Sequence, residues 1–347
     1  MDATIIIPTY ERAAILLETL DRLARVEHPR GCWEVVVVDD ESRPETIQTI
    51  ADWIETADAP VRVLRQTHRG PAAARNRGAR DAAGEVLIFL DNDCLVPPDF
   101  VGRHLQGLLA NPGCWVVGRL VHPSGLRDTP FGRYRDDCWE AFHRSHPEAR
   151  VSETDGMTAA NLAVPATDFA RLGGFDEGFS IASCEDWDLA WRAREAGIRI
   201  LYDPGNVAVH NDWAVSLDHF CERQRLYSIS DVLLWRKYGE RSPRARLVRE
   251  NGPVRWSGEP PRLVLKKLLK RLLATAPGTA ATRWACAVAE RAAPDSRWSR
   301  RFYDLAVGLA IFRGVREGLT RYSAAPGPRG PGRAGERGLA RPGSGRP

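Results

Sequence analysis

Two acidic residues, Asp91 and Asp93, mark the part of the sequence with the clearest capacity for chemistry. They directly follow the apolar run 86–90, which predicts a strand buried on both faces of a parallel sheet. Ligands of open α/β sheets bind at the carboxyl ends of such strands. In extended backbone both side chains would point the same way, at a spacing that suits a divalent cation sharing its shell with phosphate oxygens. The alternative is a solvated Asp-Asn-Asp turn.

A second acidic pair, Asp39 and Asp40, ends another apolar run at 34–38. Two acidic strand ends suit a nucleotide diphosphate, because one carboxylate can accept a hydrogen bond from the base or ribose while another holds a metal on the phosphates. The first strand is not followed by G-x-x-x-x-G-K-[ST] or G-x-G-x-x-G, the loops that cradle phosphates in other folds. A cation and an arginine would therefore have to do that work. Arg75 is the candidate, and Arg77 is a second one that can equally be a solvated helix charge.

Strands and helices alternate along the N-terminal part of the chain. Apolar runs predict strands at 4–10, 34–40, 61–65 and 86–90, and helical spacing of apolar residues predicts helices at 13–25, 44–54 and 71–84. Four alternations predict the α/β class, with a doubly wound, mostly parallel sheet and crossover helices.

The signals after this part are weaker. The segment 122–155 is rich in Pro, Gly and charged residues and predicts a long excursion from the sheet. Further elements are predicted as an edge strand at 157–164, a short helix at 167–172, a glycine turn at 173–177, strands at 198–202 and 207–210, and a helix at 217–238. The glycines of the turn would let backbone approach a substrate, although a helix C-cap explains Gly173 equally well.

Three carboxylates, Glu185, Asp186 and Asp188, open a predicted helix that runs to 196. Ser183 could be its N-cap, with Asp186 completing an approximate capping box, and acids in a first helical turn are stabilised by the helix dipole. That explanation needs no catalysis. The functional alternative is that Asp186 is the base that an acceptor hydroxyl requires. Glu185 and Asp188 are then structural or orient the acceptor.

An ordered set of short motifs resembles the family 2 glycosyltransferases, which have the A-type nucleotide-diphospho-sugar transferase (GT-A) fold. The motifs are I-I-P-T-Y, V-V-D-D-x-S, A-R-N-x-G, F-L-D-x-D, G-G-F-D-E and E-D-x-D-L-x-x-R, between residue 4 and about residue 213. One departure is Glu11, where such proteins often have Asn. The resemblance implies an inverting transfer of a sugar from a nucleotide-diphosphate donor to an acceptor hydroxyl.

The resemblance also implies roles for single residues. Pro8, Thr9 and Tyr10 approach the nucleoside, Asp40 contacts the base, Arg75 lies near the nucleotide, Asp91, Asn92 and Asp93 bind ribose and metal, Glu185 contributes to substrate binding, and Asp186 is the catalytic base. His210, at the end of a predicted strand, would by itself be an ordinary core or surface histidine. Beside Asp93 the resemblance makes it a metal ligand or phosphate contact, with Mg²⁺ or Mn²⁺ as the cofactor.

The predicted function is therefore a metal-dependent hexosyl- or deoxyhexosyltransferase that uses a UDP- or dTDP-sugar. The expected acceptor is a glycan, a lipid-linked molecule or a small molecule, as in the synthesis of cell wall or polysaccharide. A nucleotidyltransferase with the same sheet is an alternative, but it would normally have a glycine-rich loop with Arg and Lys after the first strand, and 8–12 lacks it. A non-catalytic nucleotide-sugar-binding protein is the third alternative.

Composition sets the expected location and partners. The formal net charge is +4, but 324–347 contribute five Arg and one Glu, so the rest sums to about zero and no nucleic-acid partner is expected. Seven cysteines without a C-x-x-C pair favour a reducing cytoplasm over a disulfide framework or zinc cluster. The start resembles no signal peptide, and no apolar run reaches the roughly 18 residues of a membrane span.

The chain is expected to divide into a catalytic domain at 1–215, a helical region at 216–322 and a disordered tail at 323–347 rich in Pro, Gly and Arg. Within the helical region, 262–273 predicts an amphipathic helix with Leu on one arc and Lys and Arg on the other. Such a helix can lie peripherally on an anionic membrane, at the inner face of the cell membrane. It can equally pack its Leu arc on the protein and leave its cations in solvent.

Overall fold

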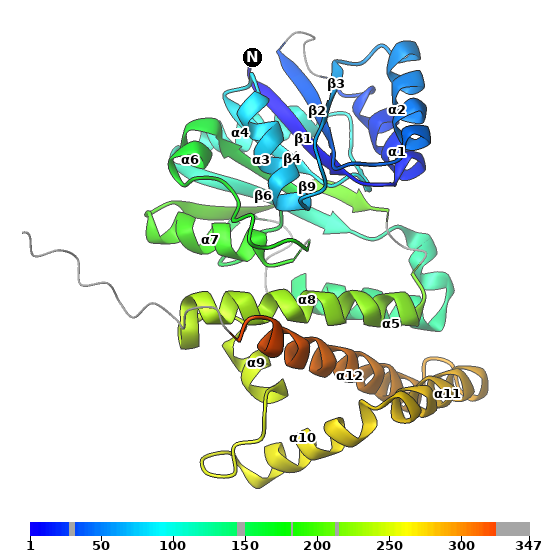
Figure 1. The fold of residues 1–347 in the computed structure, drawn as a ribbon. Coiled ribbons are helices and arrows are strands. Elements are labelled where there is room, and N and C mark those ends of the chain that lie inside the picture. The colour runs from blue at the N-terminus through cyan, green and yellow to red at the C-terminus, as the bar shows by residue number, and fades with distance from the viewer. Residues whose placement is uncertain (28–31, 144–149, 182, 212–214, 324–347) are drawn as a thin grey trace, which may run out of the picture.

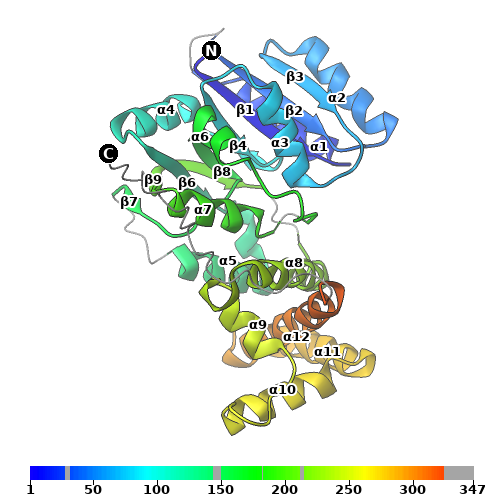
Figure 2. The ribbon, with the colours of Figure 1, turned by 60° about the vertical axis from the view of Figure 1, so that its left-hand side comes forward.

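The computed structural model describes residues 1–27, 32–143, 150–181, 183–211 and 215–323. A sheet with flanking helices forms one part, and a layer of long helices lies beside it (Figures 1 and 2). The strands are β1 (Ala3–Thr9), β2 (Trp33–Asp39), β3 (Val61–Arg65), β4 (Val86–Leu90), β5 (Cys94–Leu95), β6 (Cys114–Val121), β7 (Ser152–Glu153), β8 (Asn161–Pro165) and β9 (Arg199–His210). Their order is β3-β2-β1-β4-β8-β6-β9-β5, with β7 paired to β9.

Among the described residues, one group of α-helices flanks the sheet and a second group forms the helical layer (Figure 1). The first group is α1 (Ala13–Leu23), α2 (Pro44–Thr56), α3 (Pro71–Asp81), α4 (Phe100–Ala110), α6 (Ala166–Arg171) and α7 (Glu185–Glu195). The second is α5 (Pro130–His143), α8 (Leu217–Tyr238), α9 (Ala245–Asn251), α10 (Pro261–Leu273), α11 (Ala276–Ala292) and α12 (Arg297–Arg321). Among the described residues, no helix combines the length and apolar character that crossing a membrane requires.

The predicted α/β class is confirmed. Strands β3, β2, β1 and β4 run parallel. Both faces are covered at β2, β1 and β4, which is why these three sequences contain continuous runs of apolar residues, whereas the outer strand β3 carries two Arg and is only partly buried. On one face Ile5 and Val37 pack with Leu20 of α1. On the other, Ile6 and Phe89 pack with Leu189 of α7. The parallel register brings the carboxyl ends of β1, β2 and β4 to one edge of the sheet.

Two strand predictions in the second half are wrong in detail. β8 is not an edge strand, because it lies between β4 and β6 and is antiparallel to both. The strands predicted at 198–202 and 207–210 are one strand, β9, whose register with β6 shifts after Gly118. Asn161 of β8 fills that irregularity, since its amide donates to the carbonyl of Asn206 (3.0 Å). The sequence analysis predicts no element within 95–121, where the structure has the end of β5, α4 and β6.

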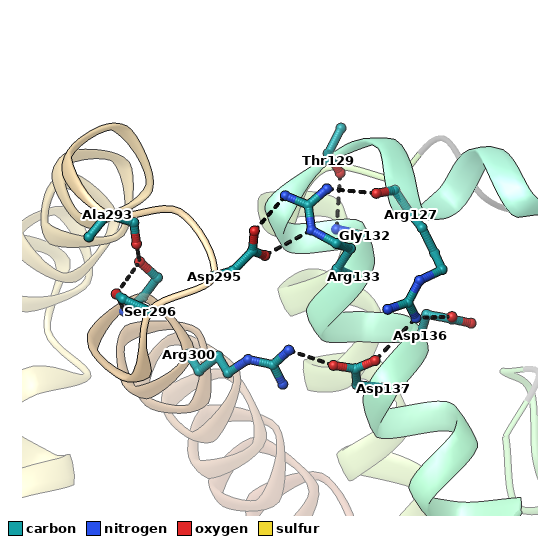
Figure 3. Close-up of polar contacts among 11 residues, drawn as sticks. Arg127, Thr129, Gly132, Arg133, Asp136, Asp137, Ala293, Asp295, Ser296 and Arg300 are labelled. Atoms are coloured by element: carbon teal, nitrogen blue, oxygen red, sulfur yellow. Dashed lines mark hydrogen bonds and ion pairs between the residues drawn. The ribbon is translucent and has the colours of Figure 1, made fainter.

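Within the excursion predicted at 122–155, Pro130–His143 form α5, a helix that the sequence did not predict. Phe131 and Tyr134 of this helix are buried against Tyr303 of α12. Figure 3 shows the polar contacts beside this core, where Arg133 holds Asp295 through two hydrogen bonds of 2.8 Å each. A helix from the first half of the chain is therefore part of the helical layer.

The helix predicted at 217–238 is confirmed as α8. It crosses α12 closely, because a Cβ at Gly314 would come within 2.0 Å of the Arg225 carbonyl oxygen. The tail predicted as disordered, 323–347, lies outside the described residues from 324 onward. Of the two alternatives left open for 262–273, the structure does not show the one in which the Leu arc packs on the protein, because Leu265 and Leu272 are exposed and Lys267 is buried.

Candidate active site

The site lies where β1, β2 and β4 end. Pro8 and Thr9 close β1, and the Asn92 amide that follows β4 donates to the Thr9 hydroxyl (3.1 Å). Asp40, one residue beyond β2, accepts the backbone N–H groups of Arg69 (2.9 Å) and Gly70 (2.8 Å). These bonds fix the start of α3 against β1 and β2. The structure thus brings the predicted residues of three strand ends together.

Asp91 and Asp93 do not share one direction in extended backbone, as the sequence suggested. Residues 91–93 form a turn in which Cys94 N–H donates to the Asp91 carbonyl (3.2 Å). The Asp91 carboxylate pairs with Arg75 (2.6 Å), whereas Asp93 pairs with Arg12 (2.9 Å) and His210 (3.3 Å). The turn therefore gives the two acids different partners.

Arg75 joins β4 to the start of α7. Its guanidinium is 4% exposed and donates to Asp91 (2.6 Å) and to Glu185 (2.8 Å), while lying over the ring of Phe175. Burial by itself would lower the pKa of Arg75, but the charges and hydrogen bonds of Asp91 and Glu185 raise it above its usual value. Burial raises the pKa of Glu185 against the opposing effect of Arg75. The buried cation is thus neutralised by two acids from different parts of the chain.

Replacing Arg75 by Lys should destabilise the protein, because one ammonium cannot reach both carboxylates with the planar fork of a guanidinium. Losing one hydrogen bond between charged groups costs roughly 1.5–3 kcal/mol. Urea unfolding of Arg75→Lys measures this loss. The control is Arg77→Lys on the same helix, where an exposed i,i+4 pair with Asp81 is worth less than about 0.5 kcal/mol. Equal stabilities of the two variants would contradict the bridging role.

Asp186 occupies the first turn of α7, but the predicted capping box is wrong. The N-cap is Cys184, in left-handed conformation (φ 71°), with no side-chain cap bond, and Ser183 precedes it. The Cys184 thiol donates to the buried Asp231 of α8 (3.3 Å), which holds the chain in this conformation. Asp186 Oδ1 instead accepts the N–H of its neighbour Trp187 (2.7 Å).

The surroundings of Asp186 favour its protonated form. Burial and the adjacent Glu185 raise the pKa of Asp186 to about 7, although the Trp187 N–H and more distant arginines act in the opposite direction. A carboxyl with a pKa near neutrality can accept a proton and release it again at physiological pH. This pKa is compatible with the base role that the resemblance implies for Asp186.

The helical layer supports α7 from behind. The fully buried Asp188 accepts hydrogen bonds from Tyr238 (2.7 Å) and Arg192 (2.8 Å) and pairs with Lys237. Arg244 lies over the Trp187 ring at 4.8 Å. Asp188 is thus held by three side chains of the protein, which favours the structural role over the acceptor-orienting one.

Asp93, Cys94 and His210 form a cluster in which one ligand atom from each lies within 4.8 Å of the others. The cluster arises because β5 pairs with the end of β9, placing Cys94 opposite His210. Burial would raise the pKa of Asp93, but the hydrogen bond and charge of His210 and the charge of Arg12 lower it to about 2. Burial and the nearby Asp91 and Asp93 raise the pKa of the Cys94 thiol.

Two residues in the site were missed from the sequence. Arg12, at the N-cap of α1, reaches Asp93, and His68 pairs with Asp40 (2.9 Å) while its ring lies 4.7 Å from that of the exposed Tyr10. Both contacts join loops far apart in the chain. The sequence signal for Arg12 was its place directly after the first strand motif, and His68 had no comparable signal.

The glycine turn forms the end of α6, as the C-cap explanation of Gly173 predicts. Gly173 and Gly174 follow α6 with positive φ, and their N–H groups donate to carbonyls of that helix. A Cβ at Gly174 would lie 2.5 Å from the side-chain oxygen of Asn76. Asn76 in turn exchanges two hydrogen bonds of 2.9 Å with the Phe175 backbone. The turn therefore packs α6 against α3.

Residues 4–157 match the family model described as Glycosyl transferase family 2. A validoxylamine A glucosyltransferase from Streptomyces hygroscopicus subsp. jinggangensis is 31% identical over 67% of this chain and 58% of its own length. A pre-mycofactocin glycosyltransferase from Mycobacterium tuberculosis is 30% identical over 65% of this chain and 46% of its own length. The chain thus spans about half the length of these curated relatives.

The fold also matches a solved structure. A mannosyltransferase from Pyrobaculum calidifontis, in complex with GDP-Man and Mn²⁺, has a TM-score of 0.57 and 22% identity over 90% of this chain and 86% of its own. At this identity the likeness concerns the fold alone. The family match and the similar sequences show that the chain belongs to the family 2 glycosyltransferases, and the likeness to the solved structure shows the GT-A fold.

Proposed function

We propose that this protein is an inverting glycosyltransferase that moves a sugar from a nucleotide-diphosphate donor, a UDP- or dTDP-sugar, to an acceptor hydroxyl. One observation carries the proposal. Buried Arg75 joins Asp91, at the end of the nucleotide-side strand β4, to Glu185, the neighbour of Asp186. This bridge links the strand end that we assign to the donor to the first turn of α7, which carries the proposed base.

The cluster around Asp93 fits a hard divalent cation, Mg²⁺ or Mn²⁺. Asp93 is held ionised, and His210 offers an imidazole nitrogen beside it. The raised pKa of Cys94 keeps its thiol protonated, which makes it a poor ligand. Two protein ligands leave positions for phosphate oxygens, as such cations commonly require. We assign the metal to Asp93 and His210, where it would supply Lewis-acid stabilisation of the leaving diphosphate.

The remaining residues bind, orient and move a proton. Tyr10 and His68 lie beside Asp40 at the edge of the sheet, and we assign the nucleoside to this region, together with Pro8 and Thr9. Asp91 and Asn92 face the ribose. Asp186 takes the proton of the acceptor hydroxyl. At the same time the hydroxyl oxygen bonds to the anomeric carbon, and the bond between that carbon and the diphosphate oxygen breaks. One displacement from the opposite side inverts the anomeric centre.

The proposed acceptor is a glycan, a lipid-linked molecule or a small molecule, in a pathway such as cell-wall or polysaccharide synthesis. We also propose a cytoplasmic location with peripheral contact to an anionic membrane through 262–273. The nucleotidyltransferase alternative is not favoured, because the segment after β1 binds other protein groups: Glu11 accepts the Arg43 N–H (2.9 Å), and Arg12 reaches Asp93.

A screen that needs no acceptor tests the proposal. Nucleotide sugars are tested for thermal protection and for slow hydrolysis, each with Mn²⁺, with Mg²⁺ and with a chelator. We expect protection by one sugar nucleotide in the presence of metal and release of its diphosphate. Protection by nucleoside triphosphates with release of pyrophosphate would support the nucleotidyltransferase, and binding without turnover would support the non-catalytic alternative.

The pH dependence of turnover follows from the state of Asp186. Because its pKa is raised to about 7 and the base must be deprotonated, kcat should rise about tenfold per pH unit below 7 and level off above it. Stability has the opposite sign, since the protonated acid is favoured in the fold and this contribution is lost as pH rises through 7. Rates measured between pH 5 and 9 test this. A flat profile, with binding of the donor unchanged, would contradict the role of Asp186.

A further inference from the structure

α10 presents its leucines to the outside. Leu265, Leu268, Leu269 and Leu272 are 58%, 39%, 50% and 68% exposed. They are three or four positions apart, so they form one stripe along the helix, which we call the leucine stripe. The surface of a soluble protein rarely exposes four large apolar side chains next to one another, and such a patch marks a contact site.

The lysines of the same helix face the protein. Lys267 is 2% exposed, and its ammonium donates to the Pro253 carbonyl (3.0 Å) and pairs with Glu259. Lys270 donates to the side chain of Asn251 (2.6 Å). These contacts hold the polar face of α10 against the end of α9 and the segment that joins the two helices. The outward direction of the leucine stripe is therefore fixed by packing.

The surroundings of the stripe are basic and aromatic. Residues 260–289 contain no Asp or Glu and six basic residues, Arg262, Lys266, Lys267, Lys270, Arg271 and Arg283. Trp256, in the segment before α10, and Trp284 of α11 are 77% and 70% exposed. α10 lies at the end of the helical layer farthest from the sheet (Figures 1 and 2).

We propose that the leucine stripe inserts into the boundary between headgroups and acyl chains of an anionic phospholipid membrane. An amphipathic helix that lies in this plane buries its apolar face while nearby cations attract anionic lipid. Exposed Trp side chains favour the same depth. A second copy of the chain is a poorer partner, because the exposed Arg262 and Arg271 of α10 would face the same cations of the other copy and repel them.

This inference deepens the membrane placement proposed above and changes its physical basis. The contact depends on apolar insertion, and Lys267 and Lys270 serve to orient the helix instead of binding lipid. It does not depend on the sugar-transfer chemistry, so either proposal can fail without the other.

The test compares binding of the full chain to sedimenting vesicles made of equal parts phosphatidylglycerol and phosphatidylcholine. The variant is Leu265→Ser with Leu272→Ser, and the matched control is Leu109→Ser, an 82% exposed leucine on α4. Burying one leucine side chain in the membrane raises the partition coefficient about tenfold or more. The double variant should therefore bind about 100-fold more weakly. Wild type and the control should bind equally, and all three should bind less to vesicles of phosphatidylcholine alone.

Three outcomes would overturn the inference. They are no vesicle binding by wild type, equal binding by wild type and the double variant, and a wild-type dimer in light scattering that the double variant loses without any vesicle binding. Because the substituted leucines are exposed, the melting temperature should not change. Donor hydrolysis without acceptor should also be equal in all three proteins, which separates a failure here from a failure of the transferase proposal.

Discussion

Asp186→Asn should lower turnover by roughly two to four orders of magnitude while donor affinity stays unchanged, because it removes the proton acceptor and little else. Asn keeps a side-chain oxygen that can accept the Trp187 N–H, which Asp186 now accepts at 2.7 Å. Stability should therefore change by less than the roughly 1 kcal/mol typical of capping effects. Transfer rate, donor titration and thermal melting on one preparation measure all three quantities.

Asp188→Asn provides the matched comparison two residues away. Asp188 is buried between Arg192, Tyr238 and Lys237, so loss of its charge should destabilise the fold by roughly 1–3 kcal/mol. Its turnover per folded molecule should stay near that of wild type. If Asp186→Asn were well folded and nearly fully active, the base would have to be another group, with Glu185 the nearest carboxylate.

Asp93→Ala should abolish the part of donor binding that depends on a divalent cation. Asp93 is the only carboxylate in the Asp93–Cys94–His210 cluster found among the described residues, and without it one imidazole and a protonated thiol remain. The fold should survive, because Arg12 is half-exposed and regains solvent when its partner is removed. Calorimetric titration of the donor with Mn²⁺ and with a chelator measures the difference.

The control is Asp99→Asn, which removes the same charge from an exposed carboxylate paired with Arg103 near the start of α4. This protein should titrate like wild type. A second variant, His210→Ala, should weaken the metal dependence without removing it, since the carboxylate remains. Identical metal-dependent affinities for wild type and Asp93→Ala would show that the cation, if it binds, uses other ligands.

Local patterns were sufficient for the elements that the sequence predicted well. The Val and Ile runs of β1, β2 and β4 and the spacing in α8 need only neighbours along the chain, so their bounds agree closely with prediction. The same holds for acids at strand ends, because a parallel sheet brings those ends together. Long-range contacts decided the rest. Ser183 lost its predicted capping role because Cys184 is held by Asp231, 47 residues away.

Periodicity has a similar limit at α10. The spacing of its leucines correctly predicts an amphipathic helix, but it cannot tell which arc faces the protein. That choice depends on Glu259, Asn251 and the Pro253 carbonyl, which offer partners for two ammonium groups. The partners of Asp93 were likewise hidden, since Arg12 is 81 residues away in the chain.

The position of α5 in the helical layer has a consequence for how the chain is made. Tyr134 of α5 donates to Asp304 of α12, 170 residues later. At roughly 5–20 residues per second, a ribosome needs about 10–30 s to deliver that partner. During this interval the apolar side of α5, with Phe131 and Tyr134, is synthesised but uncovered. Nascent chains should therefore depend on chaperones until α12 emerges, and fragments that stop at the end of the sheet should aggregate instead of forming a free catalytic domain.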